Sequence, residues 1–517
     1  MTAGGWPLWH AAPPVSPEGD DVSTAPGTDT PGNLADLVRA AARRCPDKAA
    51  LVSGRETLTW QALDARVDAV AGGLRGRGLR AGDRVAVHLG NVPDFVVVYF
   101  AALRAGLVAV PVNTGYTVPE LQHLLGDSGA RLVVTTPGSL IEQLDPSPPD
   151  VVTDVDLLVG QVDDDGAAAA GGEDLAVVLY TSGTSGRPRG AMLSHRALLA
   201  NLDQASAIDP PVVSADDVVL LVLPLFHVYG LNGALGLVAR HAATGVLAER
   251  FDPVETLELV RRHGVTSLVG APPMWVAWSM LPEVEGAFTS VRLALSGAAP
   301  LPPSVLRRVL EVTGHHVFEG YGLTETAPVL TSTLMSEVAK PGSIGRPLPG
   351  VELRLLDEQG REVEDGDPGE IVVRGANVFS GYWPDGAEGP DADGWFATGD
   401  IAVQDDDGDL RLVDRRKELV LVSGFNVYPR EVEEVLAAHP GVAECAVLGI
   451  PHPYTGESVK ALVVLVEGVS LTVDEVVAHC ARSLARFKCP TAVEFVEELP
   501  HTATGKVSKG RLREQAT

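Results

Sequence analysis

The stretch DLAVVLYTSGTSGRPRG, residues 174–190, joins an apolar run to a loop of glycine and hydroxyl residues. The run DLAVVLY predicts a buried β-strand, whereas TSGTSG would make a poor core and a poor helix. Two arginines, Arg187 and Arg189, follow the loop. Backbone N–H groups, hydroxyls and cations are the groups that bind phosphate in proteins. The sequence therefore predicts a phosphate-binding loop at the end of a strand.

This loop fits neither of the two common nucleotide-binding patterns. No GxxxxGK[ST] and no GxGxxG can be drawn through it. Taken alone, the segment is also compatible with a flexible surface loop. The rest of the chain has to decide between these two interpretations.

Helical and β-branched segments alternate from residue 33 onward. Residues 33–44 predict an amphipathic helix with Asn33 as its N-cap. Strand, helix, strand, helix and strand patterns follow at residues 84–89, 94–106, 107–113, 119–129 and 131–136. Such alternation predicts parallel sheets covered by helices, with ligands bound at the carboxyl ends of the strands.

The pattern changes near residue 350. Short alternating strands between Gly and Asp turns predict a small antiparallel barrel or meander, and the strand and helix patterns after it predict a compact α+β domain. The first 30 residues are rich in Pro, Gly, Ser, Thr and Asp, which is typical of disorder. We therefore predict an α/β fold whose parts are a disordered tail (1–30), a large N-terminal domain of mainly parallel, helix-covered sheets (31–414) with a β-barrel-like subdomain (about 350–414), and a small α+β C-terminal domain (415–517).

Composition excludes some classes of protein. The formal net charge of −28 argues against a general nucleic-acid binder, which needs a basic surface. The apolar residues 218–239 contain Pro224, His227 and Asn232, so a buried strand, a turn and a helix start explain them better than a membrane span. Four cysteines without a CxxC pair predict reduced thiols in a cytoplasmic protein.

Further motifs follow the opening loop in a fixed order. They are LPLFHVYG (223–230), LSGAAPL (295–301), GYGLTET (320–326), GEIVVRG (369–375), GWFATGD (394–400), VDRRKELVLVSGFNVYP (413–429) and TATGK (502–506). Over residues 33–514 the chain resembles the adenylate-forming superfamily of acyl-CoA synthetases, luciferases and peptide-synthetase adenylation domains. Its VSGFNVYP segment is most similar to the bacterial fatty acyl-CoA ligases. The resemblance implies an enzyme that uses ATP, Mg²⁺ and CoA, with a mobile C-terminal domain.

The resemblance also implies which residues hold the phosphates and the metal. The residues that would wrap the β- and γ-phosphates of ATP are Thr181, Ser182, Gly183, Thr184, Ser185 and Gly186. The family usually has lysine where this chain has Arg189, so the positive charge is kept but its shape is planar and forked. Glu325 and Thr184 would bind Mg²⁺, which prefers one or two carboxylates together with phosphate oxygens.

The adenosine site would be built from three motifs. Tyr321, which lies between Gly320 and Gly322 in the sequence, would stack on adenine. Thr324 would contact phosphate. Small residues in the segment 296–300, among them Gly297, Ala298 and Ala299, would form the other adenine wall. Asp400 would accept hydrogen bonds from the ribose hydroxyls, with Arg415 as its partner.

Three residues of the C-terminal domain complete the implied machinery. Lys506 would bridge the attacking carboxylate and the α-phosphate, because two anions must meet in the transition state. Lys417 would be the hinge about which the domain rotates between two poses. Gly424 would line the pantetheine channel, although a simple turn is the alternative.

His227 would lie near the substrate carboxylate, with a packed core histidine as the alternative. The catalytic residues implied are thus Lys506, Thr184, Glu325 and His227. Peptide-synthetase domains usually carry an aspartate near this point, so His227 argues for a substrate without an amino group. Residues 233–239 and 269–275 are apolar and would line an acyl pocket.

We therefore expect a ligase that converts a carboxylic acid to its adenylate and then to its CoA ester. A medium- or long-chain fatty acid is the expected substrate. A short dicarboxylic or aryl acid, and transfer to a carrier-protein thiol instead of CoA, are the alternatives. A nucleotide-binding regulator without catalysis is the alternative from another class. No nucleic-acid partner is expected, and a homodimer is one oligomeric state that the sequence leaves open.

Overall fold

The computed structural model describes residues 32–54, 56–148, 150–161, 170–181, 188–336, 339–415, 418–422, 425–452, 456–501 and 506–516. Several predictions fall outside these residues. They are the tail at 1–30, the loop residues 182–186 with the proposed metal ligand Thr184, the hinge residue Lys417, and Gly424.

The opening stretch belongs to a six-stranded sheet. Its order is β6 (Val151–Val152), β5 (Leu132–Thr135), β3 (Arg84–His88), β4 (Val108–Pro111), β7 (Leu175–Thr181) and β8 (Arg189–Ser194). All neighbouring strands are parallel except β7 and β8, which pair antiparallel and place Thr181 opposite Arg189. The predicted phosphate loop therefore joins two adjacent strands.

A nine-stranded sheet carries most of the other motifs. Its order is β15 (Arg346–Pro347), β14 (Val329–Ser332), β13 (Val317–Gly322), β12 (Leu293–Ser296), β11 (Ser267–Gly270), β9 (Val218–Leu221), β10 (Thr244–Leu247), β1 (Ala49–Ser53) and β2 (Glu56–Thr59). The strands from β1 to β13 in this order are parallel. Their carboxyl ends therefore lie at one edge, where LSGAAPL and GYGLTET begin.

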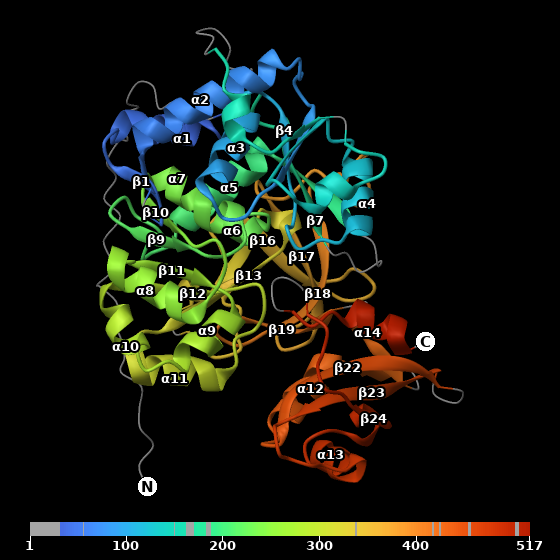
Figure 1. The fold of residues 1–517 in the computed structure, drawn as a ribbon. Coiled ribbons are helices and arrows are strands. Elements are labelled where there is room, and N and C mark those ends of the chain that lie inside the picture. The colour runs from blue at the N-terminus through green and yellow to red at the C-terminus, as the bar shows by residue number, and fades with distance from the viewer. Residues whose placement is uncertain are drawn as a thin grey trace, which may run out of the picture. The chain divides into compact units, whose positions relative to one another are not determined.

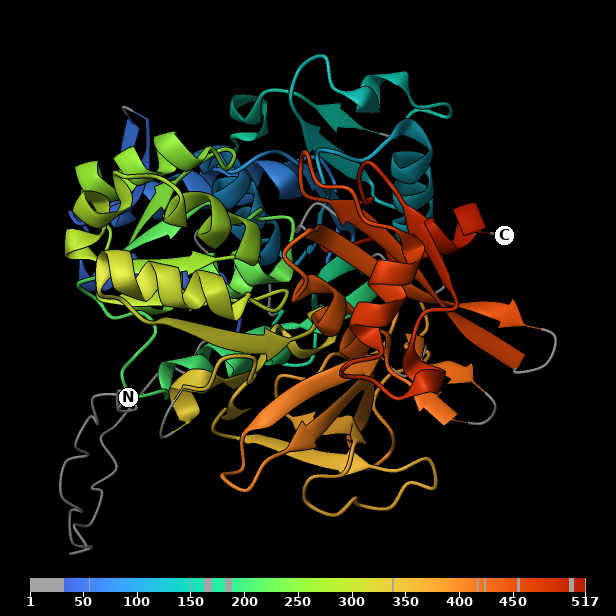
Figure 2. The same ribbon diagram turned by 90° about the horizontal axis from the view of Figure 1, so that it is seen from below.

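Helices cover both sheets, as the alternating pattern predicts. They are α1 (Asp36–Arg44), α2 (Trp60–Gly76), α3 (Pro93–Arg104), α4 (Val118–Ser128), α5 (His195–Ser206), α6 (Val228–Gly230), α7 (Leu237–His241), α8 (Pro253–His263), α9 (Pro272–Ser279), α10 (Val284–Ala287) and α11 (Pro303–Thr313). Figures 1 and 2 show α8 to α11, in yellow-green, beside β11 and β12. Every residue of α3 except Asp94 is buried, and one apolar core runs through strands of both sheets. The predicted α/β class is confirmed.

The remaining strands form two smaller sheets. An antiparallel meander consists of β16 (Val351–Leu356), β17 (Gly369–Gly375), β18 (Phe396–Gln404) and β19 (Leu410–Arg415). The C-terminal sheet has β20 (Val420–Val422), β21 (Phe425–Val427), β22 (Val442–His452), β23 (Gly456–Leu465) and β24 (Ala492–Phe495), with helices α12 (Pro429–Ala437), α13 (Val473–Cys480) and α14 (Lys509–Ala516). The apolar side chains of this C-terminal region pack into two clusters that are separate from the large core of the two bigger sheets.

Two local predictions can be compared with the structure. The N-cap prediction for Asn33 is wrong, because α1 begins at Asp36 after Ala35. The Asn33 side chain instead accepts from Ala35 N and donates to Leu103 O, so it joins the first helix to α3.

The apolar stretch 218–239 is a strand, a turn and a helix start, with a π-helical turn η3 (Leu231–Gly236). Among the helices of the described residues, none has the length and apolar character that a bilayer crossing needs.

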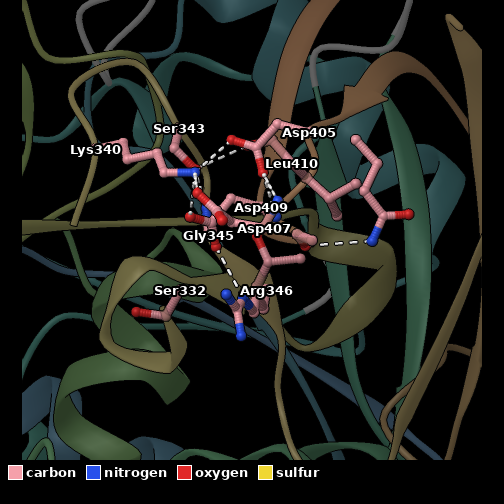
Figure 3. A network of polar contacts seen from close by, with 12 residues as sticks. Ser332, Lys340, Ser343, Gly345, Arg346, Asp405, Asp407, Asp409 and Leu410 are labelled. Carbon is pink, nitrogen blue, oxygen red and sulfur yellow. Dashed lines mark hydrogen bonds and ion pairs between the residues drawn. The ribbon is translucent and has the colours of Figure 1, made fainter. Parts of the chain in front are cut away.

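A polar network fastens the meander to the edge of the nine-stranded sheet (Figure 3). Lys340 Nζ lies 2.6 Å from Asp405 Oδ2 and 2.7 Å from Asp407 Oδ2, in the β18–β19 turn. The buried Asp409 accepts from Arg346 Nε at 3.0 Å. Because residues 342–344 also line the central cleft, this network sets the position of the β18–β19 hairpin relative to a cleft wall.

Removing the Lys340 ammonium group would leave three carboxylates close together. We expect Lys340→Met to lower the Tm by on the order of 2 °C. Although desolvation opposes it, the Lys340 ammonium lowers the pKa of Asp405, so the loss should shrink as the pH falls below about 4 and this carboxyl takes up a proton. Thermal unfolding at several pH values measures this. Arg374→Met, which breaks the exposed pair with Glu352, is the control, and an equal Tm shift in both variants would contradict the prediction.

Candidate active site

A cleft with a volume of about 2030 Å³ lies at the carboxyl ends of the parallel strands. The meander and the C-terminal residues also contribute to its walls. The predicted site residues that line it are Thr181, Arg189, His227, Gly297, Ala298, Ala299, Gly320, Tyr321, Gly322, Thr324, Glu325, Asp400 and Lys506. Arg415 lies in β19, where its backbone pairs with Asp400. Residues that are far apart in the sequence are thus brought to one cavity.

The segment 380–383 lies alongside β8, next to the predicted phosphate loop. Ser380 N donates to Met192 O, and Trp383 N donates to Gly190 O, so this segment runs antiparallel to β8. Arg189 stacks on the Tyr382 ring, 3.8 Å from its centroid, and its Nη1 lies 2.8 Å from Glu388 Oε2. The guanidinium is therefore fixed in orientation at the entrance of the loop.

Glu325 lies in the turn η5 (Thr324–Thr326) directly after β13. The Tyr382 hydroxyl donates to Glu325 Oε1. Burial, together with the Glu325 charge, raises the pKa of Tyr382 above its ordinary value, so the phenol keeps its proton and remains a donor. Across the described ranges, no three His, Cys, Asp or Glu side chains are grouped as a metal site. A single carboxylate beside a phosphate site has the chemistry of a Mg²⁺ ligand when phosphate and water supply the other oxygens.

Small residues form one wall of the cleft. After β12 ends at Ser296, Ala298 has a φ of 72°, a left-handed conformation that is uncommon for alanine. A Cβ atom on Gly297 would lie 2.9 Å from the Tyr229 ring. Ser296 Oγ is buried without a hydrogen-bond partner among the described residues. This strained, glycine-dependent wall leaves room for a flat base.

The opposite wall joins two predicted residues. The Tyr321 hydroxyl donates to Asp400 Oδ2 at 2.7 Å, which fixes the β13 motif to strand β18 of the meander. Both residues are buried at the cleft surface. An aromatic ring and a carboxylate in contact suit the base and the ribose of a nucleoside.

Sequence reasoning missed Glu319, one residue before GYGLTET. Its Oε1 accepts from Leu301 N at 2.9 Å, which holds the end of LSGAAPL against β13. Burial raises the pKa of Glu319 above its ordinary value. A charged side chain inside an apolar strand pattern was the signal that could have identified it.

His227 lines the cleft and is the N-cap of α6, where its Nδ1 accepts from Tyr229 N at 3.3 Å. With Nδ1 as acceptor, the proton of the neutral ring is on Nε2. Burial and, to a smaller extent, the positive charge of Lys506 lower the pKa of His227 to about 4. The neutral ring can therefore donate a hydrogen bond near the Lys506 ammonium group.

One part of the cleft is apolar. The residues that line it are Leu202, Ala205, Ile208, Val212, Leu237, Val269 and Leu295. Of the predicted segment 269–275, Val269 lines the cleft, whereas Met274 and Trp275 are buried in the core. The cavity thus joins a polar region suited to a nucleotide to a region suited to an acyl chain.

The C-terminal segment around Lys506 is held by ion pairs. Lys509 Nζ lies 2.8 Å from Glu433 Oε1 and 3.1 Å from Glu418 Oε2. Glu418 directly follows the predicted hinge residue Lys417 in the sequence. Lys509 therefore connects the segment that carries Lys506 to helix α12 and to the end of the hinge.

Comparisons with known proteins agree with this geometry. The AMP-binding enzyme family matches residues 38–383, and the AMP-binding enzyme C-terminal domain matches residues 431–506. The chain is 35% identical to a long-chain-fatty-acid–CoA ligase of Yersinia pestis, covering 96% of both chains. It is 37% identical to a feruloyl-CoA synthase of an Amycolatopsis species, covering 91% of this chain and 96% of that protein. The crystal structure of ATP-bound MatB from Rhodopseudomonas palustris has a TM-score of 0.87 and 36% identity, covering 93% of this chain and 99% of that one.

The lowered pKa of His227 makes a prediction about stability. The unfolded chain binds a proton at this residue near pH 6.5, but the folded protein binds it only near pH 4. Acidification within this window therefore favours unfolding. We expect the unfolding free energy of the wild type to fall more between about pH 7 and about pH 5 than that of His227→Gln. Urea unfolding at both pH values measures this, and equal falls would show that the histidine is not buried in its neutral form.

The close approach at Gly297 makes a second prediction. In Gly297→Ala, the new Cβ would displace the Tyr229 ring, so we expect pyrophosphate release with ATP and acid to fall about tenfold or more. Gly286→Ala is the matched control, because a Cβ there meets no atom within 4 Å. Similar rates in Gly297→Ala and the control would show that this wall tolerates side chains.

Proposed function

The chain belongs to the family of AMP-binding enzymes, and from this premise we propose that it is an AMP-forming acid–CoA ligase. The observation that carries the proposal is one cleft that joins nucleotide-type groups to an apolar lining, with His227 and Lys506 in the same cavity. The fold and the full-length relatives named as CoA ligases support it.

In the first step, a carboxylate oxygen attacks the α-phosphorus of ATP. The new bond joins this oxygen to phosphorus, and the bond from the α-phosphorus to the bridging oxygen breaks, so pyrophosphate leaves. In the second step, the thiol of CoA gives its proton to water and the resulting thiolate attacks the acyl carbon. The acyl carbon–oxygen bond breaks and AMP leaves with that oxygen.

The residues of the cleft have distinct roles in this proposal. Lys506 bridges the carboxylate and the α-phosphate, and His227 Nε2–H donates to the carboxylate. Tyr321 and the 297–299 wall hold adenine, and Asp400 holds the ribose with Arg415. The loop from Thr181 to Gly186 and Arg189 hold the phosphates, with Thr324. Mg²⁺, bound by Glu325 and Thr184, would neutralise phosphate charge.

The domain division also belongs to the proposal. Residues 31–414 bind ATP and the acid, and residues 415–517 rotate about Lys417 between the two steps. Gly424 then lines the channel for pantetheine. Ion pairs of Lys509 support the idea that residues near Lys506 move together with α12.

We propose a medium- or long-chain fatty acid as the substrate, since the apolar lining and the Yersinia pestis relative both favour one. An aryl acid is the second candidate, favoured by the feruloyl-CoA synthase relative at 37% identity. Four free cysteines support a cytoplasmic location. A homodimer stays a prediction, which light scattering on the purified protein can check.

A panel of carboxylic acids tests the function directly. Purified protein is incubated with Mg·ATP, CoA and each acid, and the products are identified by mass. Acyl-CoA formed from fatty acids supports the proposal, and acyl-CoA from aryl acids supports the second candidate. Acyl-adenylate that never reaches CoA would indicate a carrier-protein acceptor, and no AMP with any acid would contradict a ligase.

Separate half-reactions test the role of Lys506. We expect Lys506→Ala to slow adenylation by about 100-fold or more, because the cation acts where two anions meet. The rate at which synthetic acyl-adenylate and CoA are converted to acyl-CoA should change by less than about threefold, since no bond to phosphorus forms in that step. Rapid-quench assays measure both rates. Equal loss in both steps would contradict a role specific to adenylation.

A further inference from the structure

The proposed metal ligand Glu325 has a partner that the sequence did not suggest. The Tyr382 hydroxyl donates to Glu325 Oε1, which leaves Oε2 of the same carboxylate for another ligand. Phe379 N also donates to the backbone oxygen of Glu325 at 2.9 Å. Side chain and backbone of Glu325 are therefore both bound by one short segment.

That segment is rigid for identifiable reasons. It runs alongside β8 through hydrogen bonds at Ser380 and Trp383. The Phe379 and Tyr382 rings pack edge to face, with centroids 5.1 Å apart at 79°. The orientation of Tyr382 is thus determined by the strand that follows the phosphate loop.

Arg189 completes the arrangement from the other side. Its guanidinium carbon lies over the Tyr382 ring, 3.8 Å from the centroid, and Glu388 holds the group through a 2.8 Å ion pair. A planar guanidinium can stack on an aromatic face, whereas an ammonium group on a flexible stem is attracted to that face only as a point charge. The arginine at this position therefore restricts the ring that carries the hydroxyl.

We propose that Tyr382, clamped by Arg189, is a positioning residue that orients the Glu325 carboxylate toward the Mg²⁺ ion bound with ATP. The inference rests on the proposed function and adds a specific structural reason for arginine in place of lysine. Partners that orient a metal ligand commonly change metal affinity by about 10-fold to 100-fold when they are removed.

Metal binding to a nucleotide complex tests the proposal without relying on turnover. Full-length protein is saturated with α,β-methylene-ATP and titrated with Mn²⁺, and bound Mn²⁺ is measured by electron paramagnetic resonance. We expect Tyr382→Phe to weaken Mn²⁺ binding by about tenfold. Nucleotide binding without metal, and the KM for the acid, should stay within about twofold of wild type.

Arg189→Lys is the second variant, because it keeps the charge and removes the stack. It should weaken Mn²⁺ binding in the same direction and by a smaller factor. Tyr99→Phe is the matched control, since the buried Tyr99 hydroxyl has no hydrogen-bond partner among the described residues. Its Mn²⁺ affinity should equal that of wild type. If Tyr382→Phe does not unfold cooperatively, Tyr382→Trp, which keeps the aromatic ring and removes the hydroxyl, replaces it.

The outcomes separate this inference from the function on which it rests. Unchanged Mn²⁺ affinity in Tyr382→Phe and Arg189→Lys overturns the positioning role and leaves the ligase proposal intact. The positioning role is also overturned if metal affinity and metal-free nucleotide affinity fall, and the KM for the acid rises, all by the same factor. Such a result would indicate general disruption of the cleft. Wild-type protein that binds no nucleotide overturns both proposals.

Discussion

A carboxylate and a triphosphate repel each other, and this chain must bring them together while carrying a formal net charge of −28. The solution lies in a few placed cations and neutral donors rather than in the mean field. Lys506 is one of only seven lysines in the sequence and lies in the cleft. His227 beside it is neutral because burial lowers its pKa to about 4. In the proposed reaction, these two residues would supply two donors and one positive charge where the anions meet.

The walls of the cleft are fastened by polar contacts between segments that are far apart in the sequence. Asp400, in the middle of strand β18, is held by the Tyr321 hydroxyl, and the β18–β19 turn is held by Lys340. Lys509 binds the segment after Lys506 to Glu433 and Glu418. The ammonium groups of Lys340 and Lys509 thus fix elements around the cleft.

The fold class could be predicted because periodicity is a local property of the sequence. The alternation before residue 350 gave parallel sheets, and the resemblance to an adenylate-forming family is confirmed by the matches over residues 38–383 and 431–506. Motif residues such as Tyr321 and Asp400 could be named because of that resemblance, although their mutual hydrogen bond could not be predicted. Their roles stay predictions.

Contacts between distant segments could not be predicted from one sequence. Tyr382 and Glu325 meet only because an irregular segment pairs with β8, and no periodic pattern marks such pairing. Asn33 looked like a helix cap, but tertiary hydrogen bonds to α3 use its side chain instead. Arg189 appeared as a departure from the family pattern, and its stacking partner became visible only in three dimensions.

The fate of the carboxylate oxygens tests the adenylation chemistry most directly. The protein is incubated with Mg·ATP, CoA and a long-chain fatty acid labelled with ¹⁸O in its carboxylate, and the mass of AMP is measured. Attack at the α-phosphorus predicts AMP with one ¹⁸O atom, because the thiol breaks the bond on the acyl side of that oxygen. Acyl-CoA formed together with unlabelled AMP, or with the label in inorganic phosphate, would contradict an acyl-adenylate.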